Sequence, residues 1–198
     1  MAIAHPEHWP PEGGPVVLYG LDWESYEALV KLFEDRYPAL RMTYLEGTLE
    51  IMKTSRDHEE IKKIIARLLE IWAVHHHVTL NGLGHTTFRK QAKERGLEPD
   101  ECYALGALGD APDIAIEVVK TRGVIDKLDV YAGLGVKEVW TWKNGALQVH
   151  RLVGDRYELA DSSALLPDLD IPHLVSFVSL GADQTDTVRA YWDSLKRA

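Results

Sequence analysis

The amino-acid sequence predicts an α/β protein in which a β-sheet of mixed strand direction is flanked by helices. Two glycine turns, Glu46-Gly47 and Asn144-Gly145, each separate two short apolar runs and predict hairpins of antiparallel strands. A strand pattern at 113–119 is followed by a helical pattern and a further strand, the order of a crossover between parallel strands. Because the chain carries both kinds of connection, we expect a mixed sheet with added hairpins.

Periodicity in the first part of the chain predicts two helices and a series of strands. Apolar residues at helical spacing predict a first helix over 23–37, which Pro38 ends. A longer helix follows Ser55 and Asp57, whose side chains can cap its first turn. Strand patterns, separated by polar or glycine-rich breaks, occupy 41–52 as a hairpin, 78–81, 85–90, 100–105 and 113–119.

The rest of the chain predicts a meander of strands between two further helices. A length of 198 residues suits one domain, so we expect a single domain over 1–198 with an irregular lead-in at 1–20. The expected elements are a helix at 123–134 that ends at Gly135, strands at 137–143, 146–151 and 156–159, and a terminal helix at 183–196.

Composition excludes several classes of protein. The longest apolar runs are too short to span a bilayer, and the first residues lack the pattern of a signal peptide, so we expect a cytoplasmic protein. A net charge of −9 argues against a generally basic surface for nucleic acid, although it allows a local basic patch. Cys102 is the single cysteine, which excludes an internal disulfide, and we expect it to be packed in a strand.

Two carboxylates interrupt strands that are otherwise apolar. Alternation places Asp113 and Glu117 on one face of the 113–119 strand and its isoleucines on the other. A buried ionised carboxylate needs a cation, a basic group or water beside it, and a neighbouring strand begins at Asp100. Asp100 and Glu117 are therefore candidates to share a divalent metal. Asp113 lies roughly 13 Å from Glu117 along an extended strand, so we expect it to bond nearby backbone instead.

This acid pair resembles the metal-binding acids of the PD-(D/E)-X-K nuclease superfamily, in which an Asp and a Glu on adjacent strands bind magnesium. In that pattern a lysine follows the second acid by two positions, but Val119 occupies this position here. Lys127 is the candidate replacement, because it lies at the edge of the apolar stripe of the predicted helix and its ammonium can extend toward the strand end. Periodicity alone favours the alternative, in which Lys127 extends outward into solvent.

The order of motifs within residues 40–178 resembles one family of that superfamily, the Uma-type restriction endonucleases. Members of this family resemble nucleases whose lysine has moved from the strand to the following helix, and the resemblance implies a restriction-endonuclease-like fold. The motifs are, in order, Tyr44-Leu45-Glu46-Gly47, His58, Pro99-Asp100, Pro112-Asp113-Ile114-Ala115-Ile116-Glu117-Val118, Asp126-Lys127-Leu128-Asp129-Val130-Tyr131, Gly135-Val136-Lys137-Glu138-Val139-Trp140 and Leu165-Leu166-Pro167.

The resemblance implies a metal-dependent endonuclease that hydrolyses phosphodiester bonds of DNA. Asp100, Glu117 and the backbone carbonyl of Val118 would hold one Mg²⁺, for which Mn²⁺ can substitute. Lys127 would orient or help to deprotonate the attacking water and would bind a phosphate oxygen. Glu46 is a candidate for an additional carboxylate at the site, with an exposed turn acid as the equal alternative.

Other side chains have both a structural and a functional interpretation. Nucleases of this fold often dimerise, so we expect a homodimer, with Trp140, Trp142 and the Asn144-Gly145 hairpin as a candidate interface. For the two tryptophans, core or dimer packing is favoured over stacking on bases. At the start of the long helix, a structural role of His58 is favoured over a phosphate contact. The adjacent residues His75-His76-His77 are expected to end that helix rather than to bind a metal.

Two other functional classes stay open. A catalytically inactive module of the same fold, which binds nucleic acid or a protein partner, is consistent with Val119 and with the acidic net charge. A small domain whose acids are only ion-paired in its core is the third possibility. Binding of Mg²⁺ or Mn²⁺ separates the metal-dependent nuclease from these two classes.

Overall fold

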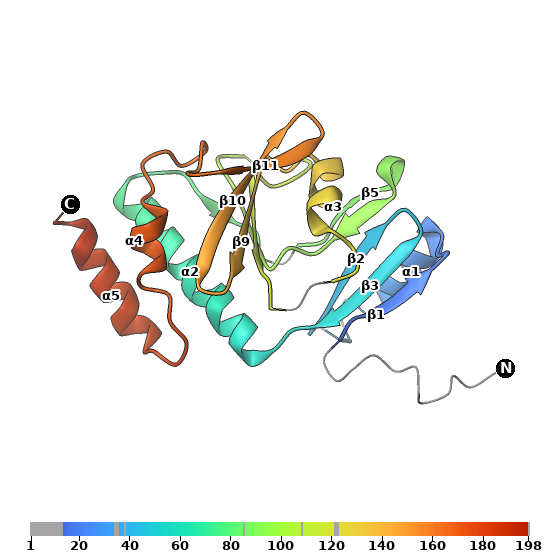
Figure 1. Cartoon of the computed structure of the whole chain (residues 1–198), viewed down its shortest axis with the longest axis horizontal. Coiled ribbons are helices and arrows are strands. Elements are labelled where there is room, and N and C mark those ends of the chain that lie inside the picture. Colours follow the sequence, from blue (N-terminus) through green and yellow to red (C-terminus); the bar gives the residue numbers. More distant parts are fainter. Residues whose placement is uncertain are drawn as a thin grey trace.

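The computed structural model describes residues 14–33, 36–37, 39–84, 86–107, 109–120 and 123–197 of the chain. The predicted class is confirmed: the fold is mixed α/β, and its strands form two sheets with helices packed against them (Figure 1). Residues 1–13 of the expected lead-in, Pro38 and the strand start at His85 lie outside the described residues.

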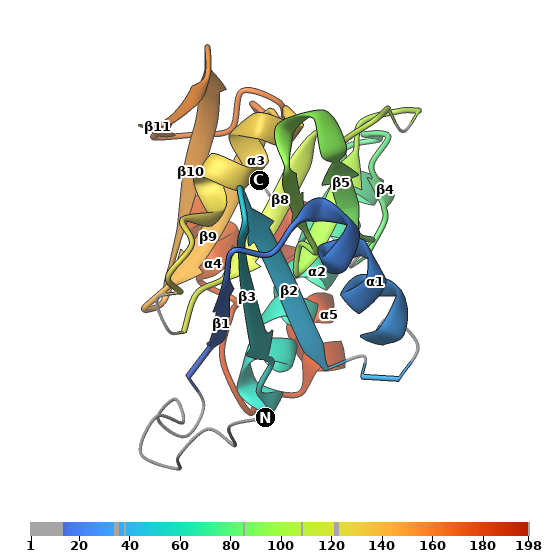
Figure 2. The same cartoon turned by 90° about the vertical axis from the view of Figure 1, so that its right-hand side faces the viewer.

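The first sheet has five strands, and all of its pairs are antiparallel. The predicted hairpin forms its centre, with Glu46 (φ 45°) and Gly47 (φ 87°) in left-handed conformation at the turn. Helix α1 (Trp23–Phe33) lies beside β2 (Figure 2), and its buried residues pack with those of β2 and β3. In spatial order the strands are β1 (Val16–Tyr19), β3 (Thr48–Lys53), β2 (Leu40–Leu45), β6 (Arg95–Leu97) and β5 (Phe88–Lys90).

The second sheet has six strands and is mixed. Strands β8 (Ile114–Val118) and β9 (Glu138–Lys143) are parallel and are connected through α3 (Lys127–Leu134), which confirms the predicted crossover. The Asn144-Gly145 turn joins β9 to β10 (Ala146–Val153) as expected, with φ values of 52° and 82°. The remaining strands are β11 (Arg156–Ala160) at one edge and β7 (Glu101–Ala104) and β4 (Asn81–Gly82) at the other.

The six-stranded sheet separates two helical layers. On one face, α2 (Arg56–His75) covers the aliphatic side of β8, α4 (Ile171–Val175) contacts β10, and α5 (Gln184–Leu195) packs against α2. On the other face, α3 lies between the two sheets, in contact with β2, β5 and β6 (Figure 1). The side chain of Glu117 therefore lies on the face that α3 covers, as the alternation in β8 predicts. Among the described residues, no helix has the length and hydropathy needed to cross a bilayer.

Several predicted boundaries need correction. Helix α1 is described over Trp23–Phe33, and Arg36 and Tyr37 are not helical, so the helix does not reach the predicted residue 37; the expected lead-in contains β1. Helix α3 begins at Lys127 and not at 123, because Asp126 has extended backbone and its carboxylate accepts a hydrogen bond from the N–H of Leu128. The strand predicted at 78–81 is reduced to β4, and the sequence patterns did not predict β6 or α4.

Other side chains take the structural roles that the sequence favoured. His75 is the last residue of α2 and His76 is its C-cap. Asp113 accepts hydrogen bonds from the N–H of Leu105 and from Lys137, so its structural interpretation is confirmed. Trp140 and Trp142 are buried in the core beside α2, so they do not provide the dimer interface considered from the sequence.

Candidate active site

A cavity of about 560 Å³ lies beside β8 and is lined by residues of both sheets. Its walls come from β3, the start of α2, the residues around β8, the 123–128 segment, and the facing sides of β9 and β10. Five of the residues that line it form a cluster of ionisable side chains, Glu50, His58, Asp100, Glu117 and Lys127.

Asp100 is held rigidly just before β7. It is buried, and its Oδ2 accepts hydrogen bonds from the N–H of Val118 at 2.7 Å and from Nε2 of His58 at 2.8 Å. Burial acts to raise the pKa of Asp100, but the hydrogen bond from His58 and the charges of Lys127 and His58 outweigh it and lower the pKa. Burial acts to lower the pKa of His58, but the hydrogen bond and charge of Asp100 raise it above its ordinary value. The two side chains therefore form a charge-assisted pair.

Glu117 and Lys127 form the second half of the cluster. The Lys127 Nζ lies 2.6 Å from Oε2 of Glu117, and the hydroxyl of Tyr131 donates to Oε1. Burial raises the pKa of Glu117, against the ammonium of Lys127, and the nearby charge of Asp100 raises it further. Burial acts to lower the pKa of Lys127, but the carboxylates of Glu117 and Asp100 raise it, so the amine is held as a cation. Two acids and one cation therefore meet at this cavity.

Lys127 reaches Glu117 from the first residue of α3, and not from a helix interior as the sequence suggested. The preceding segment, 123–126, is not helical, and it is fixed by Glu50 of β3, whose Oε2 accepts from the N–H groups of Val124 and Ile125. Gly123 allows this arrangement, because a Cβ at that position would lie 2.4 Å from Oε1 of Glu50. Glu50 thus ties one sheet to the segment that presents Lys127.

Glu50 is the site residue that the sequence analysis missed. Its signal was an acid between Leu49 and Ile51 in a predicted strand, the same kind of interruption that drew attention to Glu117. The carboxylate is buried together with Leu49, and it lies more than 70 residues from its partners in sequence. Alternation identifies such an acid but does not identify its partner.

Glu46, the other acid of this hairpin, does not join the cluster. Its side chain is 62% exposed and pairs with Arg95 at 3.1 Å. The positive φ of Glu46 turns it away from the strand direction, so the exposed turn acid is the correct alternative. Val118 lines the cavity and donates its N–H to Asp100, and the use of its carbonyl as a metal ligand stays a prediction.

The donor set of the cavity is compatible with a hard divalent cation. Among the residues that the structure describes, no group of three or more His, Cys, Asp or Glu side chains is arranged to hold a metal ion. Mg²⁺, however, commonly binds one or two carboxylates and keeps several waters. Both hydrogen bonds that Asp100 accepts from the described chain use Oδ2, which leaves Oδ1 for a cation. Asp100 and Glu117 therefore fit Mg²⁺ better than an ion that needs nitrogen or sulfur ligands.

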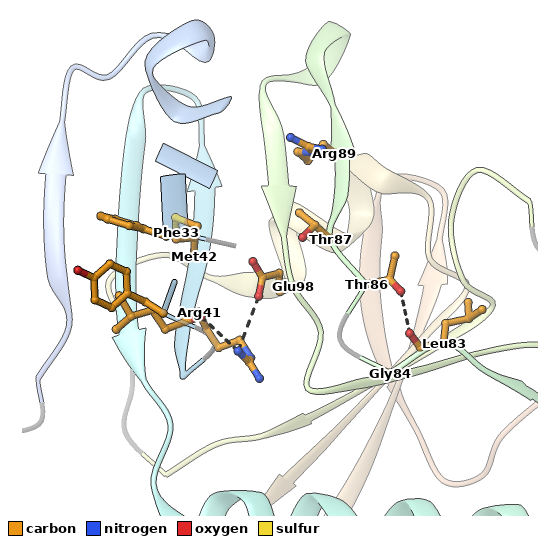
Figure 3. A pocket seen from close by; sticks show the side chains of 11 residues that line it. Phe33, Arg41, Met42, Leu83, Gly84, Thr86, Thr87, Arg89 and Glu98 are labelled. Atoms are coloured by element: carbon orange, nitrogen blue, oxygen red, sulfur yellow. Dashed lines mark hydrogen bonds and ion pairs between the residues drawn. The ribbon is translucent and has the colours of Figure 1, made fainter. Parts of the chain in front are cut away.

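A second cavity, of about 430 Å³, adjoins this one (Figure 3). Arg41 lines both cavities, and its Nη1 lies 3.8 Å from Oε2 of Glu98. Figure 3 shows these two side chains pointing toward each other, with Met42 and Phe33 near one end of the cavity and Arg89 farther along it. The guanidinium of Arg41 thus lies between the acidic cluster and a mixed polar and apolar pocket.

Two buried acids, Asp100 and Glu117, and a half-buried lysine, Lys127, lie on one face of a mixed sheet, as the resemblance to nucleases predicted. The family model described as "Uma2: Putative restriction endonuclease" matches residues 23–182, and the chain belongs to this family. The resemblance to Uma-type restriction endonucleases that the motifs indicated is confirmed.

Comparison with solved structures gives a weaker similarity. A crystal structure of a "putative nuclease belonging to DUF820" from Anabaena variabilis is similar to this chain with a TM-score of 0.44 and 16% sequence identity. The similarity covers 76% of this chain and 90% of that chain. No curated protein matches the sequence.

Proposed function

We propose that the chain is a metal-dependent endonuclease that hydrolyses phosphodiester bonds of DNA. The observation that carries the proposal is the position of Lys127, whose ammonium lies 2.6 Å from Glu117 in the cavity that Asp100 also lines. This position supplies the cation that Val119 cannot provide. Membership of a restriction endonuclease family supports a nuclease, and DNA as substrate is part of the proposal.

Asp100 and Glu117, with the carbonyl of Val118, would hold the metal, Mg²⁺ or in its place Mn²⁺. When bound, such an ion lowers the pKa of a coordinated water and offsets negative charge that develops on the phosphate. His58 holds the Asp100 carboxylate in one orientation through the 2.8 Å hydrogen bond. Tyr131 holds the Glu117 carboxylate in the same way, because its hydroxyl donates to Oε1. The chain thus keeps both acids oriented before any ligand binds.

Lys127 would bind a non-bridging phosphate oxygen and orient the attacking water. Its side chain is 27% exposed, so the ammonium can contact a ligand in the cavity while it remains next to Glu117. An ammonium in this position stabilises the additional negative charge of the transition state more than that of the bound phosphodiester.

The charge around the cavity also supports a polyanionic substrate. Five lysine and arginine side chains line it, against four carboxylates, although the whole chain has a net charge of −9. Basic residues at a groove attract the phosphate backbone independently of sequence. The five are Arg41, Lys53, Lys120, Lys127 and Lys143.

Nicking of supercoiled plasmid DNA tests the proposal. Cleavage should require Mg²⁺ or Mn²⁺, stop with chelator, and fall at least about 100-fold in Asp100→Asn, Glu117→Gln and Lys127→Met, because each removes charge used in the reaction. Lys196→Met is the matched control, because Lys196 is an exposed lysine at the C-cap of α5, outside the cavity; this variant should cleave as the wild type does. Cleavage that survives all three site variants refutes the assignment.

Calorimetry with Mg²⁺ and Mn²⁺ separates the nuclease from an inactive module. The wild type should bind metal and Asp100→Asn should not, because Asp100 would be a ligand. Absence of binding at millimolar metal favours a module whose acids are only ion-paired, as Glu117 and Lys127 are here. Sedimentation measures the predicted homodimer, whose interface has to use residues other than the buried Trp140 and Trp142.

A further inference from the structure

A row of uncharged polar side chains continues across the sheet from the acidic cluster. Thr141 of β9 lies opposite Glu117 of β8 in the parallel register and opposite Gln148 of β10 in the antiparallel register. His150, two residues further along β10, points to the same side, and all three side chains line the 560 Å³ cavity. We call Thr141, Gln148 and His150 the β9–β10 row.

The spacing of strands places this row within reach of a nucleotide bound at the acidic cluster. Neighbouring strands lie about 4.8 Å apart, so Gln148 is two strands, or about 10 Å, from Glu117. The base of a nucleotide whose phosphate lies at Lys127 and Glu117 can reach this distance. The lining of the cavity also includes Val124, which is 59% exposed.

The row has the hydrogen-bonding groups that suit a base edge. Gln148 is exposed, and its side chain forms no hydrogen bond with the described part of the chain, so its amide offers two donors and an acceptor to a ligand. Thr141 Oγ1 lies 3.0 Å from Nε2 of His150, which fixes both side chains. Burial lowers the pKa of His150, against the charge of Asp126, so the ring is neutral at neutral pH; with Nε2 on Thr141, Nδ1 is the ring nitrogen left for a ligand.

The chemistry favours a base over a phosphate at this row. A phosphate requires positive charge, and the three side chains of the row carry none; the basic side chain beside them is Lys143, two residues from Thr141 on the same face of β9. Uncharged amide and hydroxyl groups read base edges, and an exposed aliphatic side chain such as Val124 can pack against the face of a base.

From this geometry we infer that Thr141, Gln148 and His150 form a nucleobase subsite that reads the base next to the cleaved phosphodiester. This inference rests on the proposed function, because the position of the phosphate defines the position of the base. It adds a residue that determines sequence preference, Gln148, to a site otherwise made of charged groups.

Binding of short labelled DNA oligonucleotides, single-stranded and duplex, tests the subsite independently of cleavage. In Ca²⁺, we expect one abasic position to weaken binding by the wild type about tenfold, the size of one good base contact. Gln148→Ala should lose most of this sensitivity, whereas Gln91→Ala, an exposed glutamine outside the cavity, should keep it. Equal sensitivity in the wild type and in Gln148→Ala overturns the inference, as does equal binding of intact and abasic DNA at every position.

Sequencing of the cleaved ends separates this inference from the proposed function. Wild-type cuts should show a base preference at one position next to the cut, and Gln148→Ala and Thr141→Val should flatten it while cutting continues. Cutting with an unchanged preference overturns the subsite and leaves the nuclease intact. Position-dependent binding without any cutting overturns the nuclease chemistry and supports the subsite.

Discussion

Replacement of Glu50 tests whether one buried carboxylate fixes the segment that presents Lys127. Its Oε2 accepts from the N–H of Val124 at 2.5 Å and from that of Ile125 at 3.3 Å. Glu50→Ala removes both acceptors, and the N–H of Ile125 is buried where water cannot replace the lost partner. We therefore expect Glu50→Ala to release residues 123–126 and to move the start of α3.

The expected size of the effect follows from these two bonds. A hydrogen bond to a charged acceptor contributes about 1.5–3 kcal/mol, and the longer bond to Ile125 is at the low end of that range. Removal of a buried carboxylate also relieves its desolvation cost, which offsets part of the loss. We expect Glu50→Ala to lower the free energy of unfolding by about 2 kcal/mol. Glu50→Gln keeps one oxygen acceptor and should cost about half as much.

Gly123→Ala is the matched perturbation from the other side of the contact. A Cβ there would lie 2.4 Å from Oε1 of Glu50, so the carboxylate has to move away from the two N–H groups. We expect a loss of about 1–3 kcal/mol from this overpacking. Because both variants act on one contact, their effects should not add in the double variant.

Urea unfolding measures the free energies, and hydrogen exchange measures the amides of Val124 and Ile125 directly. These two amides should exchange faster in Glu50→Ala and in Gly123→Ala than in the wild type. The amides of α2 should still exchange in the same relative order as in the wild type. Plasmid nicking should fall in Glu50→Ala and recover in part in Glu50→Gln. A change in unfolding free energy below about 0.5 kcal/mol, with unchanged exchange, refutes the role assigned to Glu50.

Two further predictions concern buried groups away from the cavity. Glu138 is buried, and its carboxylate accepts hydrogen bonds from Trp140 Nε1, Ser163 Oγ and the N–H groups of Ala164 and Leu165. Glu138→Ala should therefore lower the free energy of unfolding by about 3 kcal/mol or more. Urea unfolding measures this loss, and an unchanged midpoint contradicts the prediction. Burial raises the pKa of the Cys102 thiol to about 12, so at pH 8 a thiol reagent should label the unfolded chain and not the native one. Rapid labelling of the native protein contradicts the burial of Cys102.

Parts of the site were predictable because their signals are local. Alternation in a five-residue strand placed Glu117 opposite the aliphatic face that packs on α2, and the structure has it there. The proximity of Lys127 to Glu117 was also predicted, but from a helix that begins at 123, whereas Asp126 caps a helix that begins at Lys127. A lysine at the first turn of a helix points back toward the preceding strand, so the same contact arises from a different geometry.

Contacts between distant segments were not predictable in the same way. His58 was expected to have a structural role at the start of α2, and its hydrogen bond to Asp100 depends on how α2 packs against the sheet. The strands divide between two sheets because β5 and β6 pair with β2 and not with the strands around β8. Pairing partners of short strands depend on which apolar faces can be buried together, and this is a property of the whole chain.

The sequence by itself determined the class of fold, the two glycine hairpins, the crossover and the acids Asp100 and Glu117, because turn chemistry and side-chain periodicity act over a few residues. Only the tertiary structure decided that Glu50, and not Glu46, approaches the cluster, and that an uncharged row on β9 and β10 continues it. The physical reason is that a buried carboxylate is stabilised by whichever donors the packed sheets bring to it, and these donors come from segments far apart in the sequence.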